Sequence, residues 1–139
     1  MGTLTIEAGL VTKLTTTAGL TALISTRVYL ERIPQGGTLP CLTYQRISTP
    51  RVLTHDTSGS AGTAYPRFQF DAWAATYLSA KAITDALRAA LNGFKGTITS
   101  GADTVVVQAA LIDTETSAPD LEADLARVRS EYVIWHVEA

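Results

Sequence analysis

The segment covering residues 127–137 constrains the possible folds of this chain most strongly. Its apolar residues occupy both alternating sets of positions: Val128, Tyr132 and Ile134 in one set, and Val133, Trp135 and Val137 in the other. Successive side chains of a strand point to opposite faces, so the segment predicts a strand that is apolar on both faces. Such a strand must be covered on both sides, either by helices or by a neighbouring subunit.

Residues 76–92 carry the clearest helical pattern in the chain. Apolar side chains recur every three or four positions and form one broad face: Leu78, Ala82, Ile83, Ala86, Leu87, Ala90 and Leu91. Gly93 follows directly, where a left-handed residue commonly ends a helix. Weaker patterns of the same kind predict a first helix over residues 4–16, with Thr3 as its N-cap, and a short second helix over 18–25.

Further segments have the alternation or the β-forming composition of strands. They cover residues 27–33, 41–48, 65–74, 95–99 and 104–113. A Ser-Gly-Ala-Asp turn at residues 100–103 joins the last two as a hairpin. A chain of 139 residues has the usual length of one domain. We therefore predict a single α+β domain over residues 1–139, in which an antiparallel (mixed) sheet packs against two main helices.

Residues 48–64 are predicted to form a long flexible loop. The segment is rich in Thr, Ser and Gly, and Val52 and Leu53 are its main apolar residues. Long loops of this kind are usually functional or disordered.

The search for catalytic or metal-binding residues finds weak candidates. His55, Asp56 and Ser58 lie together in the long loop but have no nucleophile-elbow pattern around them. Cys41 is the only cysteine, and the two histidines are far apart, so neither a metal site nor a cofactor is expected. Asp71, just before the long helix, is expected to bond backbone amides at the strand-to-helix corner. We predict that the protein is not an enzyme.

The charges are unevenly distributed, although the net charge is only −2. Residues 27–67 hold five arginines, whereas residues 103–124 hold six acids and no base. The two regions are either solvated surfaces or faces that meet between neighbouring copies, a head-to-tail contact that generates rings or filaments. The candidate subunit or partner interface consists of Arg46, Arg51, His55, Asp56, Arg67, Asp113, Glu115, Asp120, Glu122, Asp124 and Trp135.

Several short patterns, spread over nearly the whole chain, resemble one protein family. They are Arg27-Val28-Tyr29, Pro40 opening a strand with Tyr44, Phe70-Asp71-Ala72-Trp73, and the terminal Tyr132-Val133-Ile134. Together with the leading Leu-containing helices, they are similar to the tail-terminator and tail-completion proteins of the head–tail connector in long-tailed bacteriophages. The chain departs from that family between Tyr29 and Pro34, where Leu30-Glu31-Arg32 intervenes.

The resemblance implies a structural subunit of a hexameric ring that caps the tail tube and joins it to the head connector. Its implied partners are further copies of itself, the tail tube protein and the head connector or stopper protein, with DNA passing through the lumen without sequence-specific binding. The implied location is the virion, after a period in the host cytoplasm, with no membrane contact, and no catalytic residues come with the resemblance. The alternative is a small cytoplasmic module that binds a partner or ligand through the 48–64 loop.

Overall fold

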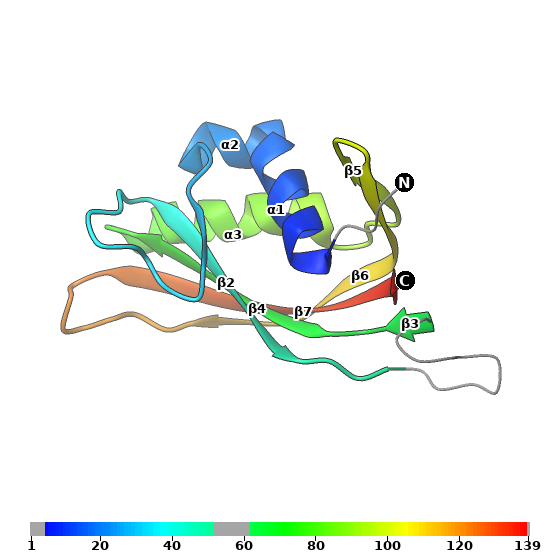
Figure 1. The fold of residues 1–139 in the computed structure, drawn as a ribbon. Helices are drawn as coiled ribbons and strands as arrows, with labels where there is room; N and C mark the ends of the chain where they lie inside the picture. The colour runs from blue at the N-terminus through cyan, green and yellow to red at the C-terminus, as the bar shows by residue number, and fades with distance from the viewer. Residues whose placement is uncertain (1–4, 52–61, 139) are drawn as a thin grey trace.

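The computed structural model describes residues 5–51 and 62–138, and it contains helices on one side of a curved sheet (Figure 1). The helices are α1 (Ile6–Thr16), α2 (Ala18–Ile24) and α3 (Tyr77–Leu91). The strands are β1 (Val28–Leu30), β2 (Cys41–Ser48), β3 (Gly62–Ala64), β4 (Arg67–Ala74), β5 (Gly96–Ser100), β6 (Asp103–Ser117) and β7 (Ala126–Glu138). The predicted α+β class is confirmed.

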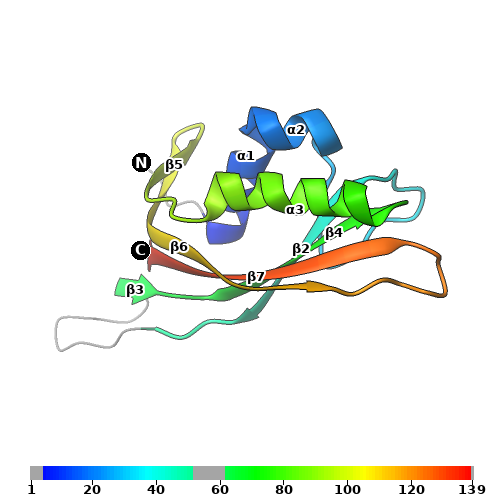
Figure 2. The same cartoon turned by 180° about the vertical axis from the view of Figure 1, so that it is seen from behind.

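The strands form one mixed sheet in the order β1-β2-β4-β7-β6-β5, and β3 pairs with the end of β7. The pair β1–β2 is parallel, whereas the other pairs are antiparallel. All three helices lie on the same side of this sheet, and α2 packs on α1 and α3, farther from the strands (Figures 1 and 2). The opposite face, called the open face below, carries no helix in the part of the chain that the structure describes.

The hydrophobic core fills the space between the helices and the sheet. One face of each main strand supplies it, including Phe68 and Phe70 from β4 and Tyr132 and Ile134 from β7, all fully buried. Leu87, on the predicted apolar face of α3, is fully buried as well, whereas Leu78, which the pattern placed on the same face, is 81% exposed near the start of the helix. The two apolar sets of the last strand therefore have different surroundings, since helices cover only the set that contains Tyr132.

The ends of the helices follow from local chemistry. The Thr76 hydroxyl accepts a hydrogen bond from the Ser79 amide and begins α3, and Gly93, at φ 80°, supplies the expected left-handed residue after it. At the first helix the expected N-cap was wrong. Helix α1 begins at Ile6, and its cap is Thr5, whose hydroxyl accepts from the Ala8 amide at 3.2 Å.

Three strands differ most from the sequence prediction, whereas the bounds of β4, β5 and β7 shift by one or two residues. Strand β1 ends at Leu30 because Glu31 turns the chain with a positive φ of 65°. Strand β3, at the end of the predicted long loop, was not predicted; three residues are too few to show a pattern. Strand β6 runs on to Ser117, because pairing with β7 continues through polar residues that have no apolar alternation.

Candidate assembly surfaces

A set of paired charges occupies the centre of the open face. Arg67, predicted at the interface, donates to Asp113 at 2.5 Å and lies 3.4 Å from Glu131. The hydrogen bond to Asp113 is the main reason that the pKa of Arg67 is raised. The structure thus brings together Arg67 and Asp113, two predicted interface residues, within one subunit.

Asp71 and the residues around it continue this polar surface. The expectation that Asp71 would bond backbone amides at a corner was wrong, because its carboxylate accepts from Arg129 Nε at 3.0 Å across the β4–β7 pair. Next to it, the Arg127 guanidinium lies 4.8 Å from the centre of the Trp73 ring. The Trp73 indole donates to the Thr43 hydroxyl at 2.9 Å. Side chains from three strands therefore partner one another here.

An apolar patch lies beside these charges on the same face. The Trp135 ring stacks on Tyr65, with centroids 4.3 Å apart and planes 15° from parallel. Around this pair, Leu111 is 51% exposed and Val137 is 39% exposed. We call the following residues the open-face patch: Tyr65, Val106, Leu111, Val133, Trp135 and Val137. The sequence identified Trp135 but missed Leu111, which falls directly opposite Val133 in the β6–β7 register.

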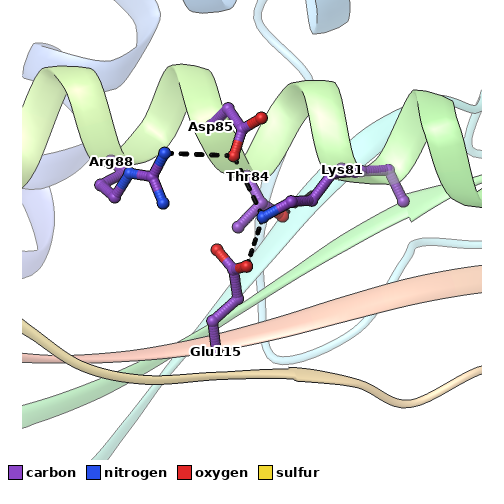
Figure 3. Close-up of polar contacts among 6 residues, drawn as sticks. Lys81, Thr84, Asp85, Arg88 and Glu115 are labelled. Atoms are coloured by element: carbon purple, nitrogen blue, oxygen red, sulfur yellow. Dashed lines mark hydrogen bonds and ion pairs between the residues drawn. The ribbon is translucent and has the colours of Figure 1, made fainter.

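Two further predicted interface residues point toward the helices. Arg46 forms an ion pair with Glu7 of α1, and its guanidinium lies 5.5 Å from the Phe68 ring centre. Glu115 pairs with Lys81 of α3, which also lies 3.2 Å from Asp85 (Figure 3). These two ion pairs therefore connect helices α1 and α3 to the sheet.

The three acids at 120–124 lie at the tip of the β6–β7 hairpin. The Asp120 carboxylate accepts from the Ala123 amide at 3.2 Å, and Asp124 adopts a positive φ of 54°. Glu122 is exposed. Between them, Leu121 is 85% exposed, more than any other large apolar side chain in the described part of the chain. Its sequence signal was a single leucine within an acidic turn.

A hollow of about 740 Å³ lies at the opposite edge of the sheet. It is lined by β1 and the segment after it: Val28, Tyr29, Leu30, Arg32, Ile33, Pro34 and Gln35. Leu30 is 57% exposed there. This is the region where the sequence departs from the resembled family, and the predicted subunit or partner interface included no residue from it.

The other predicted residues add little to these surfaces. Arg51 is exposed, and its backbone forms an isolated bridge with Ala64. His55 and Asp56 lie outside the described residues, as does most of the predicted 48–64 loop. Within residues 5–51 and 62–138, no three His, Cys, Asp or Glu side chains form a group that could hold a metal ion. Nor is any described helix long and apolar enough to span a membrane.

The surfaces left open by this fold are therefore one face of the sheet, its β1 edge and the tip of the β6–β7 hairpin. The model of the family Tail completion protein gp17 matches residues 8–136, and the chain belongs to this family of phage tail proteins. Among solved structures, it is similar to a chain in the virion of a native gene transfer agent particle. That match has a TM-score of 0.60 and 21% identity, and covers 91% of this chain and 90% of that one. A search of curated proteins found no match.

Proposed function

We propose that this tail protein works as one subunit of a closed ring, a hexamer, that caps the tail tube and joins it to the head connector. Membership of the tail-completion family supports a structural role in the virion without catalysis. Besides further copies of the chain, the partners in this proposal are the tail tube protein and the head connector protein. DNA passes through the lumen without sequence-specific binding, and the subunit waits in the host cytoplasm before assembly.

The open-face patch is the observation that best supports assembly. Helices cover one apolar side of β7, whereas the side with Val133, Trp135 and Val137 has no helix over it in the described residues. Apolar and aromatic side chains gathered on a surface commonly mark a protein–protein interface. The neighbouring charges are already paired within the subunit, so they can enter an interface without leaving an isolated charge.

The proposal is tested by examining the purified protein alone and mixed with tail tubes. Sedimentation velocity and negative-stain microscopy should show six-subunit rings, or caps on the ends of tubes. Leu111→Asp places a charge in the open-face patch and should reduce ring formation or tube capping. Leu78→Asp is the matched control, because Leu78 is 81% exposed on α3, away from the sheet. A protein that remains monomeric and never binds tube ends would contradict the proposal.

A further inference from the structure

The tip of the β6–β7 hairpin projects beyond the rest of the sheet. Strand β4 ends at Ala74, which pairs with Ala126, so residues 118–125 lie past the end of this neighbour. The tip remains ordered through a bridge between Asp120 and Leu125, with hydrogen bonds in both directions at 3.0 Å. Leu121 is therefore an apolar side chain presented on a defined turn.

The hollow at the β1 edge has the complementary chemistry. Val28, Leu30, Ile33 and Pro34 give it apolar walls, and Arg32 is the one charged residue among those that line it. Arg32 is exposed and makes no ion pair with any described residue. The hollow thus combines exposed apolar side chains with polar groups and one cation that has no ion-pair partner among the described residues.

The hairpin tip and the hollow are separate surfaces, carried by different strands of the sheet. Strand β1 is one edge of the sheet, and the β6–β7 hairpin lies toward the other, with β2 and β4 between them. The hairpin tip and the β1–β2 connection lie at the same end of the sheet in both views (Figures 1 and 2). A surface on one edge that binds a different surface on the opposite edge makes a head-to-tail contact, which can close into a ring.

We propose that the β6–β7 hairpin tip of one subunit binds the β1-edge hollow of the next, with Leu121 seated between Leu30 and Pro34. Glu122 then faces Arg32, so the contact joins an apolar side chain to the apolar part of the lining and an acid to a base that forms no ion pair within the described subunit. The occupant of the hollow is a second copy of this chain. This inference rests on the proposed ring, and it specifies which surfaces form each subunit contact.

Cysteine cross-linking tests this contact directly. The double variant Leu30→Cys/Leu121→Cys is oxidised under mild conditions, with and without tail tubes, and separated on a non-reducing gel. Because the two positions lie toward opposite edges of one sheet, a disulfide between them joins different subunits. A ladder extending beyond the dimer is expected. The native Cys41 is fully buried, and each single variant serves as the control for its participation.

A second variant measures the contribution of the apolar contact. Because burying a leucine side chain contributes favourable free energy to binding, Leu121→Asp should weaken the affinity of each contact by about tenfold to a hundredfold. Leu78→Asp should leave that affinity unchanged. Circular dichroism checks that both variants fold.

The outcomes separate this inference from the proposed function. Rings or tube caps without the cross-link ladder would overturn the hairpin contact and leave the ring intact. A ladder accompanied by open filaments would support the contact and overturn the closed ring. Cross-links that stop at the dimer would indicate a two-fold contact and overturn the inference. A chain that gives neither ladder nor tube binding overturns both.

Discussion

Tyr132 lies at the centre of the core, in β7. Its ring meets Phe70 edge to face, with centroids 5.6 Å apart. Its hydroxyl is buried and makes no hydrogen bond to the described residues. A buried polar group without a partner costs free energy, because it loses its bonds to water and gains nothing in return. The ring therefore stabilises the fold, whereas the hydroxyl opposes it.

Tyr132→Phe should consequently stabilise the protein. The substitution keeps the aromatic ring and removes the hydroxyl, so the free energy of unfolding should rise by about 1 kcal/mol. Urea denaturation followed by circular dichroism measures this change. Tyr77→Phe is the control, because Tyr77 is exposed and its hydroxyl costs nothing in the folded state. A loss of stability in Tyr132→Phe would show that the hydroxyl has a partner after all.

Tyr132 also makes the free energy of unfolding depend on pH in the alkaline range. Burial raises the pKa of Tyr132 above its ordinary value of 10.0. Below that value the phenol is neutral in both states; above it the unfolded chain loses the proton first, so the free energy of unfolding falls as pH rises. Burial also raises the pKa of Cys41, to about 11, with the same sign. Tyr132→Phe should flatten the decline above pH 10 without abolishing it, as measured by unfolding at several pH values.

Helix α3 separates core and surface leucines on one element. Leu87→Ala should lower the free energy of unfolding by about 2–5 kcal/mol, because it leaves a cavity between α3 and the sheet. Leu78→Ala, on the exposed side of the same helix, should change it by less than about 0.5 kcal/mol. Chemical denaturation of both variants measures the difference, and equal losses would show that α3 does not pack through the side that carries Leu87.

The sequence predicted those elements whose pattern is carried by their own residues. The apolar repeat of α3 and the alternation of β2 gave correct elements, and the bounds of β2 were correct as predicted. The ion pairs could not be predicted in this way. Arg67 and Asp113 are 46 residues apart in sequence and meet only because β4 and β6 flank β7. The charge distribution indicated which regions carry opposite sign, but strand order determines which side chains meet.

On the scale of the whole molecule, the three acids of the hairpin tip have different roles. Asp120 bonds the turn and Asp124 adopts a left-handed conformation that aspartate tolerates, so replacing either also disturbs the backbone. Glu122 has neither of these backbone roles, so replacing it tests the contribution of its charge to assembly alone.

We therefore expect Glu122→Lys and Arg32→Glu each to weaken assembly slightly, because an exposed ion pair contributes only about 0–1 kcal/mol. The double variant should restore assembly by reversing the pair. Sedimentation measures ring or tube-cap formation, and Asp103→Lys, a change at another exposed acid, serves as the control. No recovery in the double variant would argue against contact between these two residues.

Added salt should weaken assembly of the unmodified protein, because exposed charges are screened over roughly 8–10 Å at physiological ionic strength. The Glu122→Lys variant should show a smaller salt dependence. Sedimentation over a series of salt concentrations measures this. The same dependence in both proteins would assign the salt effect to other charges.

Residues 118–125 lie between the ends of β6 and β7 and are joined across the turn by the Asp120–Leu125 bridge, whereas residues 128–133 of β7 pair with β4 on one side and β6 on the other. Amide hydrogens in such a turn exchange with solvent through local opening, and those in the middle of a sheet exchange only through larger openings. In a free subunit, deuterium should therefore enter residues 118–125 early and the β4–β7 pair late. The hairpin tip therefore opens at the lowest free-energy cost in the β6–β7 pair. Binding of a neighbouring subunit should slow hydrogen exchange there first.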